Sequence, residues 1–339
     1  YDLGKTIMSN PLDNTDLNLD PPGRGRVYGD ITETIGNTPL VRLNNIAKNA
    51  GAKAEVLVKL EFFNPMSSVK DRLAVAMIAA MEADGSIGPG STIVEPTSGN
   101  TGVGLAFVCA AKGYRCILTM PDSFSKERRK MFLALGAELE LTPRAEGING
   151  SIKKAEELVA AIDGAVMPYQ FGHPANPEIH RRTTAEEIWA DTAGNVDAVV
   201  MGVGTGGTLT GVADVLKARK PDVHITAVEP MDSPVISGGN HSPHMIQGIG
   251  AGFIPPVLDM DQIDSIEQVS NDDAIDTAKL MATSEGIPCG ISSGAAVCAA
   301  LRVAVRDGME GKTVVAIVPD FAERYISSIL FDGMDIWDD

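Results

Sequence analysis

The stretch Asn64-Pro65-Met66-Ser67-Ser68-Val69-Lys70-Asp71-Arg72 decides how this 339-residue chain is interpreted. Ser67 or Ser68 can cap a helix that starts there, and its apolar face would hold Leu73, Ala76, Met77 and Ala80. Lys70 would then lie in the first turn, where the helix dipole and a closed cleft both disfavour its ammonium form. A neutral lysine amine is what Schiff-base chemistry needs. Alone, the stretch is weak, because most lysines in a first helical turn are solvated.

A second motif, Glu95-Pro96-Thr97-Ser98-Gly99-Asn100-Thr101-Gly102, joins a β-like run at 91–94 to an apolar helix at 103–112. Small polar residues at a strand-to-helix turn leave backbone N–H groups free at the start of a helix, which makes a seat for an anion. The small side chains also allow a carboxylate to come close. An ordinary turn uses the same residue types, so this motif does not decide the function alone.

A third motif, Gly202-Val203-Gly204-Thr205-Gly206-Gly207-Thr208, follows a predicted strand at 196–201 and can wrap a phosphate. It contains a literal G-x-G-x-x-G, and Glu229 ends the next strand-like run at 225–228, so a nicotinamide-dependent oxidoreductase is a competing hypothesis. A dinucleotide fingerprint normally lies in the first βα unit of its domain. This hypothesis also leaves Lys70 and the loop at 97–102 without a role.

A fourth motif, Gly290-Ile291-Ser292-Ser293-Gly294-Ala295-Ala296, leads into a small-residue helix at 295–305. The four motifs in this order resemble the cysteine synthase family, also called O-acetylserine sulfhydrylases, among the β-family pyridoxal-phosphate enzymes. The resemblance runs from about Ile31 to Leu330. It is strengthened by Ile35-Gly36-Asn37-Thr38-Pro39-Leu40, by Tyr169-Gln170-Phe171, and by Gln247-Gly248-Ile249-Gly250-Ala251-Gly252-Phe253-Ile254-Pro255.

The resemblance implies an α/β fold of the tryptophan-synthase-β type, with two domains built on parallel or mixed sheets covered by helices. Residues 1–27 would form a flexible N-terminal arm. Residues 28–63 plus 175–339 would form the larger, cofactor-binding domain, and 64–174 the smaller, mobile one. The chain itself alternates strand-like and helical runs, which favours parallel sheets. Its predicted strands are 56–60, 92–95, 115–120, 138–141, 198–201, 225–228 and 313–318, and its predicted helices include 125–135 and 151–162.

The resemblance also implies a role for each site residue. Lys70 would carry pyridoxal 5′-phosphate as a Schiff base and move the Cα proton, Asn100 would contact the cofactor's 3′-oxygen, and Ser292 its pyridine nitrogen. The cofactor phosphate would lie on Gly204, Thr205, Gly206, Gly207 and Thr208. The substrate carboxylate would lie on Thr97, Ser98, Gly99, Thr101 and Gln170, with Gly248 in the loop that faces the site.

The implied activity converts O-acetyl-L-serine and sulfide to L-cysteine and acetate by β-replacement through an α-aminoacrylate. A serine at the pyridine nitrogen cannot keep it protonated as a carboxylate does, which suits β-elimination. A cystathionine β-synthase-like enzyme is disfavoured because Gly250-Ala251-Gly252-Phe253 stands where that branch resembles Gly-Tyr-Asp-Phe. An O-phosphoserine-using sulfhydrylase stays open, although Arg144 and Lys126, the nearby basic residues, are typical of solvated surface.

Composition is typical of a cytoplasmic enzyme. The net charge of −17 disfavours nucleic acid and anionic membranes as partners. No run approaches the ~20 apolar residues of a membrane span, and the first 25 residues lack the regions of a signal peptide. The cysteines and histidines show no metal spacing, so no metal is expected, and His241 and His244 are predicted at the surface. A homodimer is the family expectation, with serine acetyltransferase as a possible partner.

Overall fold

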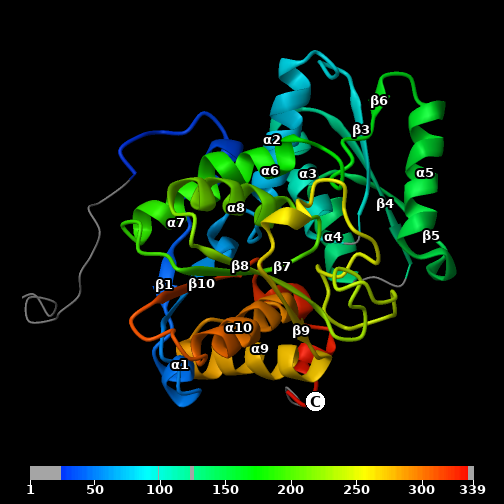
Figure 1. Cartoon of the computed structure of the whole chain (residues 1–339). Helices are drawn as coiled ribbons and strands as arrows, with labels where there is room; N and C mark the ends of the chain where they lie inside the picture. The colour runs from blue at the N-terminus through cyan, green and yellow to red at the C-terminus, as the bar shows by residue number, and fades with distance from the viewer. Residues whose placement is uncertain (1–23, 98, 123–125, 335–339) are drawn as a thin grey trace, which may run out of the picture.

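Two β-sheets form the framework of this computed structural model, which describes residues 24–97, 99–122 and 126–334 (Figure 1). The six-stranded sheet has the order β1-β2-β10-β7-β8-β9. Its strands are β1 Leu40–Arg42, β2 Glu55–Leu60, β7 Ala198–Gly202, β8 His224–Pro230, β9 Ser265–Val269 and β10 Thr313–Val318. The four-stranded sheet has the order β5-β4-β3-β6, from β3 Thr92–Pro96, β4 Arg115–Pro121, β5 Glu138–Thr142 and β6 Ala165–Val166. Every pairing is parallel except the antiparallel pair of β1 with β2.

Helices cover both faces of the larger sheet. Alternate residues of one strand point to opposite faces, and Val56 and Val58 pack with α9 and α10 while Leu57 packs with α7 and α8. In Figure 1, α9 and α10 lie below this sheet and α7 and α8 above it. The helices are α1 Asn45–Asn49, α6 Ala175–Ile179, α7 Ala185–Asp191, α8 Gly207–Arg219, α9 Asn271–Glu285 and α10 Ile291–Ala304.

The smaller sheet is also covered on both faces. Ile93 packs into a core with α2 Lys70–Ala83 and α3 Asn100–Lys112, whereas Val94 packs against α5 Gly147–Ala161 on the other side. The helix α4 Lys126–Ala134 adds Phe132 to the first of these cores. All four strands of this sheet lie within the predicted smaller domain, 64–174, whose boundaries stay a prediction.

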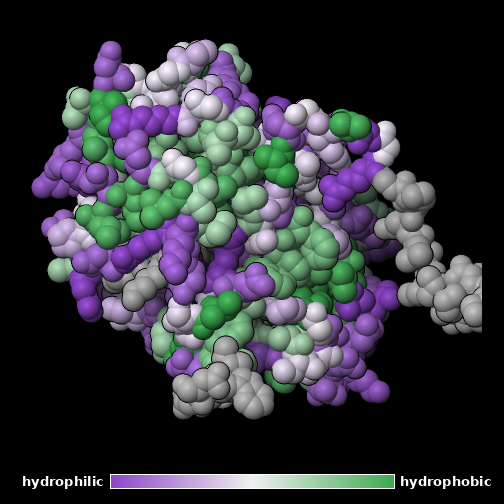
Figure 2. Space-filling model, turned by 180° about the vertical axis from the view of Figure 1, so that it is seen from behind, coloured by the Kyte–Doolittle hydropathy of each residue, from purple (hydrophilic) through white to green (hydrophobic). Residues whose placement is uncertain are grey.

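The predicted α/β fold with parallel and mixed sheets is confirmed. The seven predicted strands correspond to β2, β3, β4, β5, β7, β8 and β10, while β1, β6 and β9 were not predicted. Most of the N-terminal arm, residues 1–23, lies outside the described residues, as does Ser98. Among the described residues, none of the helices has the length and apolar character needed to cross a membrane. From behind, hydrophobic residues form several surface patches bordered by hydrophilic ones (Figure 2).

Candidate active site

The candidate site is a cavity of about 350 Å³ at which four helices begin. Lys70 and Asn100 are the first residues of α2 and α3, and Thr208 and Ser292 are the second residues of α8 and α10. All four line the cavity. The N-terminal ends of helices present free N–H groups and positive partial charge, so this arrangement favours anionic ligands.

The structure brings nearly all of the predicted site residues together. The cavity wall includes Lys70, Thr97, Gly99, Asn100, Thr101, Gln170, Gly204, Thr205, Gly206, Thr208, Gly248 and Ser292. Gly207 is buried at the start of α8, behind this wall. Ser98 is outside the described residues, so its prediction has no structural counterpart here.

Lys70 starts α2, but the predicted serine cap is wrong. The N-cap residue is Val69, and Ser68 Oγ instead accepts a hydrogen bond from the Lys70 N–H at 3.2 Å. The buried face of α2 also differs, because Leu73 and Met77 are buried while Ala76 and Ala80 are partly exposed. Burial lowers the pKa of the Lys70 amine to about 8, although the negative charge of Asp320 opposes this shift.

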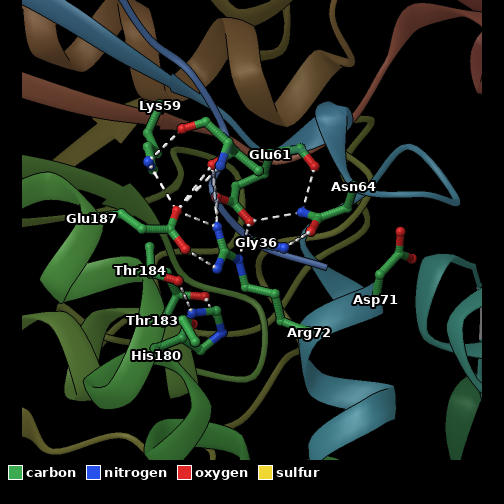
Figure 3. A network of polar contacts seen from close by, with 12 residues as sticks. Gly36, Lys59, Glu61, Asn64, Asp71, Arg72, His180, Thr183, Thr184 and Glu187 are labelled. Carbon is green, nitrogen blue, oxygen red and sulfur yellow. Dashed lines mark hydrogen bonds and ion pairs between the residues drawn. The ribbon is translucent and has the colours of Figure 1, made fainter. Parts of the chain in front are cut away.

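A buried charge network anchors the first turn of α2 (Figure 3). Arg72 points between two carboxylates, donating to Glu61 at 2.7 and 2.8 Å and to Glu187 at 2.6 and 2.8 Å. Lys59 from β2 reaches Glu187 from the other side at 2.9 Å. Burial alone would raise the pKa of Glu187, but the contacts with Arg72 and Lys59 lower it to about 2. Because Arg72 is two residues after Lys70, the network fixes the reactive lysine to the larger sheet.

The predicted carboxylate seat is a folded loop after β3. Thr97 Oγ1 accepts hydrogen bonds from the N–H groups of Gly99 at 3.2 Å and Gly102 at 3.1 Å. A Cβ on Gly102 would lie 2.6 Å from Thr97 Cγ2, so the fold of the loop needs glycine there. Thr101 Oγ1 donates to Gln170 Oε1 at 2.6 Å, which joins the seat to the loop at 169–171.

The predicted phosphate loop, 204–208, is packed too closely for side chains at its glycines. A Cβ on Gly204 would lie 2.3 Å from Gly248 O, and one on Gly207 would lie 1.9 Å from Asn176 Oδ1. Gly206 has a left-handed φ of +85°. Thr208 Oγ1 lies 3.2 Å from Nε2 of the buried His180.

Asn100 and Ser292 lie near residues that the sequence analysis did not select. Asn100 Nδ2 donates to Asp320 Oδ2 at 2.7 Å, and Tyr325 OH donates to the same oxygen at 2.6 Å. Asn100 Oδ1 is buried and has no hydrogen-bond partner among the described residues. Ser292 Oγ faces the loop at Gly248, where a Cβ would be 3.6 Å away.

Several wall residues were missed because their sequence neighbours carry no signal for the site. Asp320, Tyr325 and the buried Arg128 line the cavity. His241 and His244, predicted at the surface, also line it, so their prediction is corrected: the chain folds their loop over the cavity. A search for charged or hydroxylic residues just after β10 would have found Asp320 and Tyr325.

Glu229 does not support the nicotinamide hypothesis. Its carboxylate accepts hydrogen bonds from the backbone N–H groups of Ile236 at 2.8 Å and Ser237 at 3.2 Å, and from the Ser237 hydroxyl. Glu229 is 1% exposed. Its oxygens are thus engaged within the protein rather than presented to a ribose.

Comparison with known proteins agrees with this geometry. A family described as "Pyridoxal-phosphate dependent enzyme" matches residues 31–320. The chain is 53% identical over 307 residues to a cysteine synthase of Staphylococcus aureus, covering 90% of this chain and 98% of the relative. A crystal structure of cysteine synthase from Entamoeba histolytica has a TM-score of 0.90 and 43% identity, covering 96% of each chain. O-ureido-L-serine synthase has a TM-score of 0.88 and 45% identity, covering 93% of this chain and 98% of that one. The chain therefore belongs to the family of pyridoxal-phosphate-dependent enzymes.

Proposed function

We propose that this chain synthesises L-cysteine from O-acetyl-L-serine and sulfide, with release of acetate. One observation carries the proposal: a single cavity wall combines a lysine amine of lowered pKa with two separate anion seats, at the starts of α3 and α8. One seat suits an amino-acid carboxylate and the other a phosphate. The cysteine synthases of Staphylococcus aureus and Entamoeba histolytica, to which the chain is similar, support the choice of reaction.

The residues fit pyridoxal phosphate. The loop at 204–208 admits close approach because its glycines pack directly on neighbouring atoms, and it leads into the N-terminus of α8. The buried Asn100 Oδ1 offers a polar atom without a partner among the described residues. When bound, the cofactor supplies an electron sink for the charge that develops at the substrate Cα.

We assign Lys70 Nζ two tasks, which are to hold the cofactor through a Schiff base and to move the proton at the substrate Cα. A pKa of about 8 leaves part of the amine neutral near neutral pH, as both tasks require. Thr97, Gly99, Thr101 and Gln170 would bind the α-carboxylate, with Ser98 by resemblance. Gly204, Thr205, Gly206, Gly207 and Thr208 would bind the phosphate.

Ser292 would meet the pyridine nitrogen, and Asn100 the 3′-oxygen. A hydroxyl is neutral, so it does not hold the nitrogen in its protonated form as a carboxylate would. The ring is then a modest electron sink, and reactions in which a leaving group departs from Cβ are favoured over those that build up charge at Cα. This supports β-replacement.

The activated serine and the nucleophile are the least constrained parts of the proposal. Synthesis of O-ureido-L-serine is a second candidate, because the synthase of that name is 45% identical to this chain. Use of O-phosphoserine, or a cystathionine β-synthase-like use of homocysteine, requires only a different contact at the far end of the cavity. All four reactions share the assigned roles of Lys70 and the two anion seats.

The assembly and the movement of the chain are proposals as well. A homodimer is supported by the apolar patches of Figure 2 and by the exposure of Phe63 (56%), Leu133 (60%) and Ile326 (57%). The division into a larger domain and a mobile one at 64–174 is supported by the two separate sheets. Docking of serine acetyltransferase and a cytoplasmic location are carried over from the resemblance.

The test is product formation by the purified protein loaded with pyridoxal phosphate. Cysteine should form from O-acetyl-L-serine and sulfide, and Lys70→Ala should reduce this rate by at least about 10³-fold. The control is Lys48→Ala, which removes an exposed lysine of α1 and should retain the parent rate. Faster turnover of O-phosphoserine, homocysteine or a route to O-ureido-L-serine would replace the substrate assignment, and an active Lys70→Ala variant would overturn the mechanism.

A further inference from the structure

Gln170, in the predicted carboxylate seat, depends on a buried glutamate behind it. Glu95, in β3, is 0% exposed. Its two oxygens accept hydrogen bonds from consecutive backbone N–H groups, Tyr169 at 2.8 Å and Gln170 at 2.9 Å. Glu95 itself does not line the cavity. It therefore holds the loop from outside the site.

The loop that Glu95 holds is strained. Tyr169 has a φ of +58°, in the left-handed region that non-glycine residues adopt only at a cost. The two hydrogen bonds to Glu95 offset that cost and present the side chain of Gln170 to Thr101 Oγ1, at 2.6 Å. Without them the backbone at 169–170 is expected to relax, and Gln170 would leave the seat.

The same loop is connected to the phosphate loop through one side-chain amide. Asn176 Nδ2 donates to Gln170 O at 2.9 Å and to Thr205 Oγ1 at 3.0 Å. Asn176 is 1% exposed, and its Oδ1 lies where a Cβ on Gly207 would come within 1.9 Å. One amide thus touches both predicted anion seats from behind, without lining the cavity.

We propose that Glu95 and Asn176 are positioning residues that hold the carboxylate seat and the phosphate loop in a fixed relation to each other. Neither touches substrate or cofactor. Glu95 supports Gln170, and Asn176 ties Gln170 to Thr205. The proposal rests on the proposed function for the identity of the two ligands.

The two residues have distinguishable effects. Glu95→Gln keeps the shape but replaces one acceptor with an NH₂ group that faces a backbone N–H, so one of the two bonds is lost. The KM for O-acetyl-L-serine should rise about tenfold, with kcat within about threefold and cofactor affinity retained. Asn176→Asp turns a donating amide into an acceptor that faces Gln170 O. Both the KM and the dissociation constant of pyridoxal phosphate should rise, each about tenfold.

A matched control separates positioning from a general loss of packing. Glu229, in β8, is equally buried at 1% exposure and likewise accepts two consecutive backbone N–H groups, but it does not line the cavity. Glu229→Gln should lower the thermal midpoint about as much as Glu95→Gln while leaving KM unchanged. Cofactor affinity is measured by fluorescence titration of the apoprotein, which does not depend on turnover.

The outcomes are separable. If Glu95→Gln raises KM no more than Glu229→Gln, Glu95 is merely structural and the proposal fails for it. If Asn176→Asp binds pyridoxal phosphate like the parent, the tie to the phosphate loop fails. If Asn176→Asp does not fold, Asn176→Ser, which is too short to reach both acceptors, takes its place. Failure of the proposed function would show first in the parent protein, as an absence of cysteine formation.

Discussion

Removal of Arg72 tests how the reactive lysine is anchored. Arg72→Met keeps an unbranched apolar stem and removes the guanidinium that donates to both oxygens of Glu61 and of Glu187. The side chains of Arg72 and Glu61 are 0% exposed. Within the part of the chain that the structure describes, Arg72 is the ion-pair partner of Glu61, so the substitution leaves a buried carboxylate without a cation.

The size of the effect follows from the contacts that remain. Breaking a buried pair by removing one partner costs about 3–5 kcal/mol. Glu61 would still accept from Thr38 Oγ1 at 2.8 Å and Asn64 Nδ2 at 3.0 Å, and Glu187 would keep Lys59 at 2.9 Å. We therefore expect a loss near the lower limit, about 3 kcal/mol in the free energy of unfolding. The double variant Arg72→Met/Glu61→Met leaves no unpaired charge at Glu61 and should lose less than the single one, about 1–2 kcal/mol.

Urea unfolding of the apoprotein measures these losses, with Trp189 fluorescence as the probe. The control is Arg42→Met, which breaks a pair with Glu55 whose side chains are 62% and 37% exposed, and it should cost less than about 1 kcal/mol. A double variant that loses as much as the sum of both single losses would refute the reasoning. Equal losses in Arg72→Met and Arg42→Met would refute it as well.

Four further outcomes are expected. The rate at which apoprotein recombines with pyridoxal phosphate, followed by absorbance, should rise with pH around a midpoint near 8, because burial lowers the pKa of Lys70 to about 8; a midpoint near that of free lysine would contradict this. Asp320→Asn should move that midpoint lower, since the Asp320 charge raises the pKa of Lys70. Gly207→Ala should weaken pyridoxal phosphate binding at least about tenfold in a fluorescence titration, because the new Cβ would lie 1.9 Å from Asn176 Oδ1. The pKa of Glu187 is lowered from 4.5 to about 2, so its contribution to stability is present above pH 4.5 and lost as the pH falls toward 2; thermal midpoints of Glu187→Gln should lack this part of the acid dependence.

Local motifs predicted the parts of the site that short segments form by themselves. The loop at 204–208 and the position of Lys70 follow from glycines and helix starts that lie next to each other in the sequence. Glu95 and Asp320 could not be selected in this way, because each acts on residues far away along the chain: Glu95 on Gln170 and Asp320 on Asn100. Their function depends on which strand ends and helix starts meet, and the sequence alone does not give that.

The same limit applies to the strands. The predicted strands β2, β7, β8 and β10 are rich in buried β-branched residues, which makes a strong signal. By contrast, β6 has two residues and β9 is mostly half-buried, so neither has a hydrophobic pattern that exceeds its surroundings. β1 pairs antiparallel with β2 at the edge of the sheet, outside the repeating strand–helix alternation. The core of each sheet was predictable, and its edges were not.

The charge of the site differs from that of the whole chain, and the difference explains why helix ends are used. The chain carries a net charge of −17, so its overall field repels phosphate and carboxylate groups. Binding must then come from short-range donors. The starts of α2, α3, α8 and α10 supply them as backbone N–H groups, which keep their partial charge at any pH. Lys70 can therefore spend part of its time neutral, as its chemistry needs, because the anion seats do not rely on its charge. A site that bound its anions through lysine ammonium groups would have to choose between binding and nucleophilicity.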